Sequence, residues 1–381
     1  MTLLDIQHPV RSLAGAFAAW KALLLAIALG SGVGPAYDTS TTLVSPLLPS
    51  SNESVFDLST KLTRWDAIYF VQAARRGYLF EQEWAFGGGL PVVISSTASL
   101  LRSFGLGGTG LFLSAPYAES TFSFLSFLGY LFFAKAVLSD KRTVAHDVSL
   151  VASGMWFGFA TTFRSNGILG GVPFAFELLR ELSSPPTLAS IRRRFALIVG
   201  GSAVAVGFAV PQLVAYLTFC SGSSTAEPRP WCGKTLPSIY SFVQEQYWNV
   251  GFLRYWTPGN IPLFFLAAPV TYLLMRSGID MLQSPLRFLG GEGRSSKAPA
   301  AALDGFIRST AFSQIILATL AVTTYHVQII TRISSGYPLW YFWLASLLGD
   351  PKSHFGSKIV FFMVMYATIQ GALFASFLPP A

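Results

Sequence analysis

Stretches of apolar residues long enough to cross a lipid bilayer recur along the whole chain. A hydrocarbon core about 30 Å thick is crossed by an α-helix of about 20 apolar residues. Such stretches lie near residues 13–33, 88–104, 109–137, 147–165, 166–180, 195–219, 261–277, 306–331, 337–349 and 357–378. Because backbone groups find no water inside a bilayer, these stretches must be helical. The sequence therefore predicts an all-α, polytopic transmembrane helical bundle.

The content of charged residues supports one multi-pass membrane domain over residues 1–381. Only 12% of the residues are charged, whereas soluble proteins carry about 25%. The net charge of +8 does not indicate nucleic-acid binding, because the Lys and Arg residues lie in short runs between apolar stretches, as in cytosolic loops. We expect no nucleic-acid partner.

Three basic segments predict the orientation of the chain. They are Lys141 with Arg142, Arg192 to Arg194, and the segment from Arg276 through Arg287 and Arg294 to Lys297. Loops rich in Lys and Arg stay on the cytosolic side of a membrane. Residues 35–87 and 220–260 then form two large lumenal loops. Asn52 begins a glycosylation sequon in the first of them, which is usable only in the lumen and supports this orientation weakly.

The predicted spans fail to alternate in direction at one place. If residues 35–87 are lumenal, the stretch 88–104 returns the chain to the cytosol, yet 109–137 must also end there, beside Lys141. Two successive spans cannot run the same way. Either 88–104 is not a full crossing, or a crossing is missing around Gly105–Thr109.

Cysteine content allows a single disulfide. Cys220 and Cys232 are the two cysteines of the chain, and they flank one polar loop. A disulfide between them forms if this loop faces an oxidising lumen. Two free thiols are the alternative.

The first lumenal loop ends in a segment dense in charged and aromatic residues. Residues 61–86 contain Arg64, Trp65, Asp66, Glu81 and Glu83. Carboxylates beside aromatic rings are typical of sugar chemistry, in which an acid handles a hydroxyl proton and rings cover the apolar face of the sugar. The alternative is an interfacial amphipathic helix whose Asp66 pairs with an arginine.

Further polar groups interrupt apolar sequence near the predicted lumenal ends of spans. They are Glu119; Arg164 and Asn166; Trp248, Asn249 and Arg254; and His326, Gln328 and Arg332, which we expect in an apolar helix. Charges at membrane depth are costly and are candidates for function. The alternatives are a snorkelling arginine, an interfacial aromatic belt and a packing histidine. No metal-ligand spacing occurs, so we predict no metal site and no cofactor.

Five motifs, in this order, resemble a known family. They are RWDAIYF at 64–70 followed by RRGYLFEQEWAF at 75–86, then APYAES at 115–120, FRSNG at 163–167, QYWNVGFLRYW at 246–256 and HVQIITR at 326–332. Together they resemble the GPI mannosyltransferase II family, most closely its fungal members, over nearly the whole chain. The resemblance implies a GT-C glycosyltransferase fold, and Asp66 matches the family's acid in the first lumenal loop.

The resemblance also implies an activity. Members transfer the second mannose, in α1,6 linkage, from dolichyl-phosphate mannose to a GPI glycolipid in the endoplasmic-reticulum membrane, with a lumenal active site. Fungal members are associated with a small auxiliary membrane subunit. Asp66 would be catalytic, and the other polar residues named above would bind substrate. The alternatives are another dolichyl-phosphate-sugar transferase, a non-catalytic subunit and a polytopic lipid transporter.

The chain departs from this family at one place. Relatives carry a longer stretch, with another apolar span, before residues 115–120, whereas here Gly107 and Gly108 lie close to that motif. The departure coincides with the failure of the predicted spans to alternate.

Overall fold

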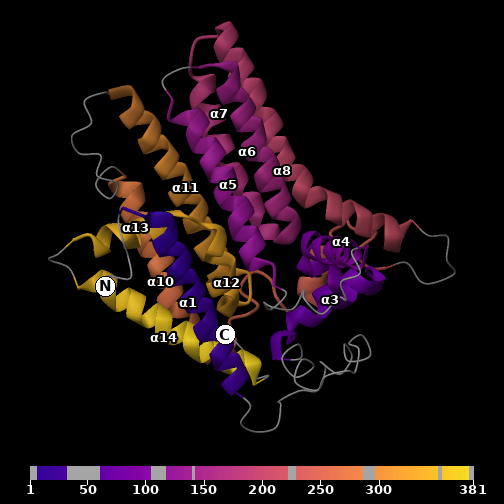
Figure 1. Ribbon diagram of the computed structural model, residues 1–381. Coiled ribbons are helices and arrows are strands. Elements are labelled where there is room, and N and C mark those ends of the chain that lie inside the picture. The colour runs from indigo at the N-terminus through magenta and orange to yellow at the C-terminus, as the bar shows by residue number, and fades with distance from the viewer. Residues whose placement is uncertain are drawn as a thin grey trace. The chain divides into compact units, whose positions relative to one another are not determined.

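The computed structural model describes residues 7–31, 61–103, 117–139, 142–221, 229–285, 297–350 and 354–376. These residues form α-helices and short 3-10 helices, and no strand occurs among them (Figure 1). Six helices in this part are long and apolar enough to cross a membrane. The prediction of an all-α, polytopic membrane protein is confirmed.

The chain divides into two compact units, each built from separate segments. The first unit holds residues 1–75, 94–117 and 354–380, and the second holds residues 76–93 and 118–353. The expectation of one membrane domain over the whole chain stays a prediction.

The first unit contains α1 (Pro9–Gly30) and α14 (Phe355–Ala375), which lie side by side, and most of α3 (Asp66–Arg76) and α4 (Gly89–Ser103). Tyr117 ties α14 to the start of α3. Its ring meets those of Phe70 and Phe374 edge-on, at centroid distances of 6.3 and 5.6 Å. Its hydroxyl donates to the Arg64 carbonyl at 3.2 Å. These contacts hold the turn that precedes Asp66.

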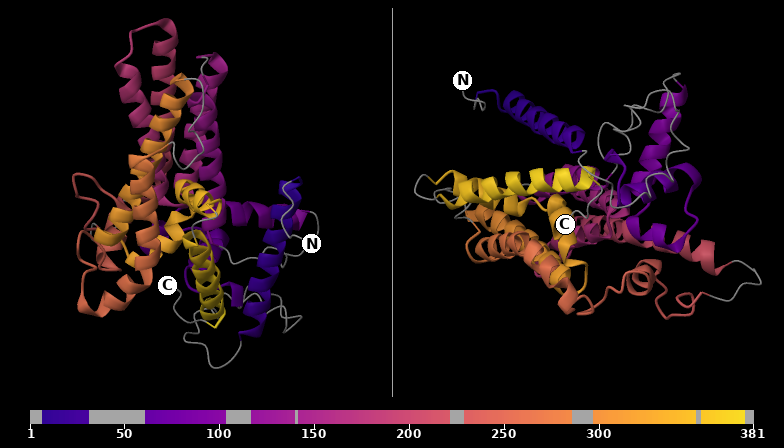
Figure 2. Two further views of the ribbon diagram at one scale, coloured as in Figure 1. Left: turned by 90° about the vertical axis from the view of Figure 1, so that its left-hand side faces the viewer. Right: turned by 90° about the horizontal axis from the view of Figure 1, so that it is seen from below.

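Four helices form the core of the second unit: α5 (Glu119–Val137), α6 (Val144–Phe163), α7 (Gly171–Leu182) and α8 (Leu188–Cys220). They pack along one another, as Figure 2 shows from two further sides. Glycines let α6 and α8 approach closely: a Cβ on Gly154 would lie 2.2 Å from the Gly200 carbonyl oxygen, and one on Gly158 would lie 2.5 Å from that of Ala203. Small residues commonly allow this contact between membrane helices.

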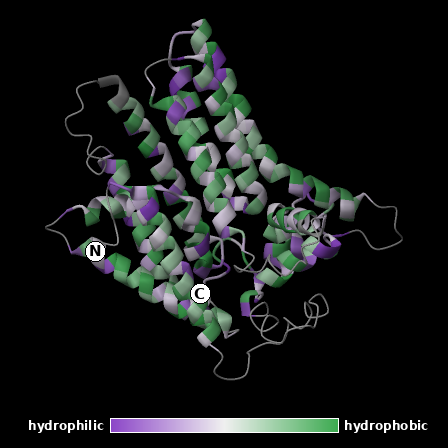
Figure 3. Cartoon of the chain, in the orientation of Figure 1, coloured by the Kyte–Doolittle hydropathy of each residue, from purple (hydrophilic) through white to green (hydrophobic). Residues whose placement is uncertain are grey.

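Ion pairs fix which helix ends lie together. Arg192 at the start of α8 pairs with Asp147 on α6, and Arg142 pairs with Glu181 on α7. We call this end of the second unit, with Arg142 and Arg192, the basic pole. Since α5 and α6 are joined at the basic pole, the first residue of α5 and the last residues of α6 lie at the opposite end. Hydrophilic residues gather at the ends of the long helices (Figure 3).

Two further long helices, α10 (Ile261–Gln283) and α11 (Lys297–Thr323), pack against each other in the second unit. The buried Gln314 amide donates to the Leu274 carbonyl and to Ser277, both at 2.8 Å. A shorter helix, α13 (Leu339–Leu348), packs on α10 through a hydrogen bond from Trp343 to Asp280.

The expectation of one apolar helix over 306–331 is wrong. Helix α11 ends at Thr323, and the chain continues as η8 (Val327–Ile329), α12 (Ile330–Ile333) and η9 (Ser334–Gly336). The Thr324 and Tyr325 amides both donate to the Leu320 carbonyl, which closes the last turn, while the Thr323 carbonyl accepts from Leu253. His326 and Arg332 therefore stand on short turns and not along a membrane helix.

Candidate functional site

One carboxylate of the second unit accepts hydrogen bonds from two arginines that lie far apart in the sequence. Glu119 Oε1 accepts from Arg164 Nη1 at 2.8 Å and from Arg332 Nε at 2.6 Å. The three side chains are 20%, 14% and 28% exposed, in that order. We call these three residues the arginine clamp, and the end of the second unit that holds them the site pole.

Helix ends position the clamp. Glu119 is the first residue of α5, where the helix dipole favours a negative charge. Arg164 follows the last residue of α6, and its extended backbone turns the chain out of the helix. Arg332 lies on the short α12.

A glycine turn packs against the end of α6 beside the clamp. Gly87 has a positive φ of 76°, and a Cβ there would lie 2.5 Å from the Thr162 carbonyl oxygen. Tyr78 donates to the Gly87 carbonyl at 2.6 Å. The glycines of this segment serve close packing, which their sequence alone does not indicate.

Asn166 joins the segment after α6 to the segment around α12. The Asn166 side-chain amide donates to the Ile333 backbone carbonyl at 3.2 Å. The Asn166 backbone carbonyl accepts from the Tyr337 hydroxyl at 2.9 Å. Tyr240 completes this neighbourhood: burial raises the pKa of Tyr240, while a hydrogen bond with Ser165 and the charge of Arg164 lower it.

Aromatic rings form a second group at the site pole. The Trp248 ring lies edge-on to Phe86 and to His326, at centroid distances of 5.5 and 6.1 Å, and Tyr255 meets His326 at 4.9 Å. The Tyr255 hydroxyl donates to Gln328 at 3.1 Å. Residues predicted from two separate motifs thus come together.

The backbone between those rings is strained. Asn249 and Leu253 have positive φ values of 49° and 57°. Non-glycine residues in this region are uncommon, and they occur where the surrounding structure holds a functional segment in place.

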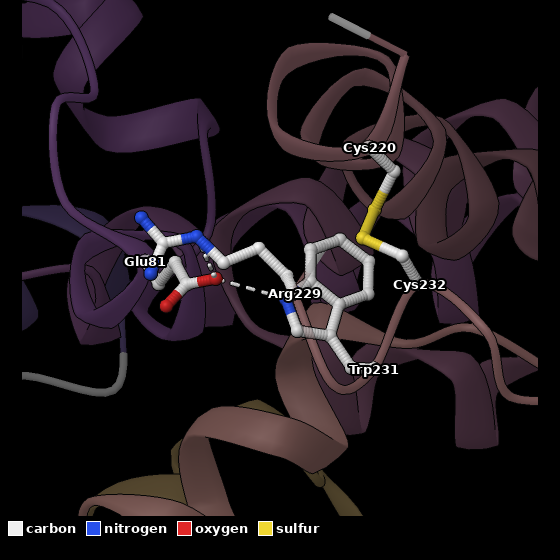
Figure 4. Close-up of a disulfide and its surroundings, with 5 residues drawn as sticks. All are labelled: Glu81, Cys220, Arg229, Trp231 and Cys232. Carbon is white, nitrogen blue, oxygen red and sulfur yellow. Dashed lines mark hydrogen bonds and ion pairs between the residues drawn. A yellow bond between two sulfur atoms is a disulfide. The ribbon is translucent and has the colours of Figure 1, made fainter. Parts of the chain in front are cut away.

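Glu81 anchors the second large loop. Its carboxylate accepts from Trp231 Nε1 at 2.9 Å and lies 3.8 Å from Arg229 Nε (Figure 4). It also accepts from the Tyr247 hydroxyl at 3.3 Å. Burial and then the neighbouring Glu81 charge raise the pKa of Tyr247. Glu81 is itself buried, so its contacts are those of a structural anchor.

A disulfide between Cys220 and Cys232 lies beside this anchor (Figure 4). It joins the end of α8 to the residue after Trp231. The buried Trp231 ring packs with Ala215, Ile239 and Val243, and both cysteines pack against this small apolar core.

Two other predicted residues form ion pairs. Glu83 is buried, and its carboxylate accepts from both terminal nitrogens of Arg76, at 2.6 and 3.2 Å. It also accepts from the backbone amides of Leu79 and Phe80. Arg254 pairs with Glu245 at 3.0 Å, and both side chains are about half exposed. The structure places neither residue in the arginine clamp.

Asp66 belongs to the first unit. It begins α3, directly after Trp65, whose φ is positive at 53°. The Arg64 carbonyl accepts from the Ala67 amide at 3.1 Å, which forms the turn into the helix. A strained residue next to a carboxylate is typical of active sites. Asn52 lies outside the described residues.

Comparison with known proteins identifies the family. A model of the family described as "Mannosyltransferase (PIG-V)" matches residues 21–105 and 92–381. The chain belongs to the PIG-V mannosyltransferase family. The predictions of the family and of a glycosyltransferase are thereby confirmed. No solved structure matches this mannosyltransferase, so the GT-C form of the bundle stays a prediction.

Named relatives of this mannosyltransferase are similar over most of its length. "GPI mannosyltransferase 2" of Chaetomium globosum is 46% identical, over 98% of this chain and 97% of the relative. The protein of the same name from Gibberella zeae is 43% identical, over 100% of this chain and 100% of the relative. "GPI alpha-1,6-mannosyltransferase 2" of Cricetulus griseus is 28% identical, over 81% of this chain and 78% of the relative.

The comparisons also bear on the short region before residues 115–120. The two matches to the family model meet at residues 92–105. The alignment with the Chaetomium relative extends over 460 positions, although this chain has only 381 residues. That relative therefore contains residues that have no counterpart in this mannosyltransferase.

Proposed function

We propose that this mannosyltransferase adds the second mannose, in α1,6 linkage, to the GPI glycolipid. The observation that carries this proposal is the full-length similarity to proteins named GPI mannosyltransferase 2, at 43% and 46% identity. The name of the hamster relative supplies the α1,6 linkage. The donor in this proposal is dolichyl-phosphate mannose, and the reaction occurs on the lumenal side of the endoplasmic-reticulum membrane.

The proposed reaction is one direct displacement at the anomeric carbon. The 6-hydroxyl oxygen of the acceptor mannose attacks that carbon, and Asp66 takes the hydroxyl proton as the new bond forms. The bond from the anomeric carbon to the phosphate oxygen breaks, and its electron pair leaves with dolichyl phosphate. The β-linked mannose of the donor thereby becomes α-linked in the product.

The leaving group is already a phosphate, so the reaction needs no acid catalyst. It needs donors that stabilise the departing charge, and guanidinium groups suit this task because they bind phosphate through several N–H groups. Arg164 and Arg254 are the residues that the sequence suggests for it. Arg164 is partly buried, whereas Arg254 lies in an exposed pair with Glu245, which favours Arg164.

The aromatic group at the site pole suits the sugar. Trp248, Tyr255 and His326 present rings close to one another, and rings commonly cover the apolar face of a hexose. In this proposal they bind a mannose residue of the acceptor. A small auxiliary membrane subunit is a further partner proposed from the fungal family.

Cells that lack the enzyme for the second mannose provide the test. Such cells accumulate a GPI glycolipid with one mannose, which mass spectrometry of extracted lipids detects. Expression of this chain, with and without the fungal auxiliary subunit, should convert that lipid to one with two mannoses, and an α1,6-specific mannosidase should remove the new residue. Persistence of the one-mannose lipid in both cases, at normal levels of the chain, would contradict the proposal.

A further inference from the structure

The arginine clamp brings two like charges to one atom. Arg164 Nη1 and Arg332 Nε both donate to Glu119 Oε1, at 2.8 and 2.6 Å. Two guanidinium groups repel each other, so this arrangement depends on the carboxylate between them. Glu119 therefore bridges the two guanidinium groups.

Arg164 donates to Glu119 through Nη1, and Arg332 donates through Nε. A guanidinium carries five N–H donors in a planar fork, which matches the oxygens of a phosphate. Two guanidinium groups that come from different segments of the chain can contact several oxygens of one phosphate. Their side chains are mostly buried, at 14% and 28% exposure, and partial burial strengthens such charge-assisted bonds.

The second oxygen of Glu119 also indicates a binding site. Glu119 Oε2 is buried, and within the part of the chain that the structure describes it has no hydrogen-bond donor. Buried polar atoms nearly always have a partner, and an exception calls for a physical explanation. A hydroxyl of a bound sugar, or a water molecule held with it, would supply the donor.

A buried tyrosine lies in the same neighbourhood. Burial raises the pKa of Tyr240, and the charge of Arg164 lowers it. The neighbourhood thus combines guanidinium donors for an anion with a hydroxyl group and a carboxylate oxygen for a sugar. These are the two chemistries of a sugar phosphate.

We propose that Arg164 and Arg332 bind the phosphate group of a lipid substrate and that Glu119 is the positioning residue that holds them. This inference rests on the proposed function, which supplies lipids of this class. The phosphate belongs either to the prenyl-phosphate mannose donor or to the phosphoinositol of the glycolipid acceptor. Arg254, which pairs with Glu245 on an exposed surface, takes no part in it.

Equilibrium binding separates the two sources without relying on turnover. The purified full chain in lipid nanodiscs is titrated with a fluorescent polyprenyl phosphate, with the corresponding polyprenol, and with a fluorescent glucosaminyl phosphatidylinositol. Arg164→Gln and Arg332→Gln should each weaken binding of one phosphate lipid about tenfold or more, as expected for a lost charge-assisted hydrogen bond. Polyprenol binding should not change.

Substitutions at Glu119 test the positioning role. Glu119→Gln keeps an oxygen that accepts from both arginines but removes the charge that offsets their repulsion, so phosphate binding should fall by less than in Glu119→Leu. Glu119→Leu removes the acceptor, and the guanidinium groups should separate. Its phosphate binding should fall as far as in the arginine variants.

Controls guard against misfolding. Arg276→Gln removes an exposed arginine that pairs with Asp280 and should bind both lipids normally. Thermal unfolding of every variant is measured, and Arg164→Lys and Arg332→Lys replace any glutamine variant that unfolds early. The lysine variants should bind phosphate more weakly than the unchanged chain, because the point charge of an ammonium replaces the planar guanidinium.

The outcomes are distinct. Loss of polyprenyl-phosphate binding assigns the clamp to the donor, and loss of glycolipid binding alone assigns it to the acceptor. Normal binding of both lipids by folded Arg332→Gln and Arg164→Gln would overturn the inference, even if the unchanged chain transfers mannose. Normal phosphate binding by Glu119→Leu would overturn the positioning role. Absence of mannose transfer by the unchanged chain would count against the proposed function instead.

Discussion

Two carboxylates, Asp66 and Glu119, each begin a helix, but their surroundings predict different roles. Glu119 Oε1 is used by two arginines, so its contacts are those of a positioning group. Asp66 follows the strained Trp65 at the start of α3. A general base needs to reach the hydroxyl proton of its substrate. We therefore assign proton transfer to Asp66 in the proposed reaction.

Asp66→Asn should lower mannose transfer by about two orders of magnitude or more, the usual contribution of a general base. Protein level and melting temperature should stay normal, because the amide keeps the shape of the carboxylate. Asp304→Asn, which affects an i,i+4 ion pair with Arg308, is the matched control and should transfer mannose normally. Near-normal transfer by Asp66→Asn would rule out the assignment.

Glu81 should contribute to stability and not to the chemical step. Glu81→Ala leaves the Trp231 and Tyr247 donors without their acceptor. Trp231 is fully buried, and an unsatisfied buried group costs about 1–3 kcal/mol. We expect a clearly lower melting temperature in detergent. Glu245→Ala, at a carboxylate that is 46% exposed, should have little effect. Equal melting temperatures for the two variants would contradict the anchoring role.

The disulfide joins the end of α8 to the segment that carries Trp231. Cys220→Ser should destabilise the chain by about 3 kcal/mol, the entropic estimate for a loop of this size. Alkylation of the unchanged chain without prior reduction should give no mass shift. A shift equal to two alkyl groups would show free thiols and refute the disulfide.

The contact between α6 and α8 should tolerate no added side chain. Gly158→Leu would place its Cβ against the Ala203 carbonyl oxygen, at 2.5 Å before relaxation. The cost should exceed the range of about 1–3 kcal/mol for overpacking between side chains, because backbone cannot move aside easily. Met155→Leu on the exposed face of α6 is the control. An unchanged melting temperature for Gly158→Leu would contradict this packing.

Much of this architecture could be predicted from the sequence, and the errors have physical causes. Apolar periodicity indicates helices reliably, but α11 ends at Thr323 because a carbonyl there accepts from Leu253, a contact far away in the sequence. Arg164 and Arg332 stood out as charges in apolar sequence. Their meeting on Glu119 depends on which helix ends lie together, which single motifs do not reveal.

Some members of the site could not be predicted. Tyr240 and Tyr337 look like ordinary interfacial aromatic residues in the sequence, and only the fold brings them to Ser165 and Asn166. Tyr255 lies in the motif that was singled out, beside Arg254, and its bond to Gln328 makes it a better candidate than that arginine. The hydroxyl groups of this motif were the available signal.

Helix α4 determines how often the chain crosses the membrane. It spans Gly89–Ser103, only 15 residues, which corresponds to about 22 Å of helix against a hydrocarbon core of about 30 Å. The family match also breaks at residues 92–105. We predict that α4 does not cross normally in this chain, or that the natural transcript encodes a further apolar span near Gly107.

Glycosylation at Asn52 and protease access at Lys141 test this prediction together. Lumenal Asn52 and cytosolic Lys141 should be accompanied by a partial crossing at residues 88–104, as judged by labelling of single cysteines placed along α4 in a chain without Cys220 and Cys232. A full crossing by that helix, with both flanking positions as stated, would be incompatible with the predicted spans.

Mannose transfer by the purified chain in a bilayer decides whether the proposed activity is correct. The acceptor is a GPI glycolipid with one mannose, and the donors compared are dolichyl-phosphate mannose, dolichyl-phosphate glucose and GDP-mannose. We predict an α1,6-linked second mannose from dolichyl-phosphate mannose alone, with loss of transfer in Asp66→Asn. Equal transfer from GDP-mannose, or a product with another linkage, would contradict it.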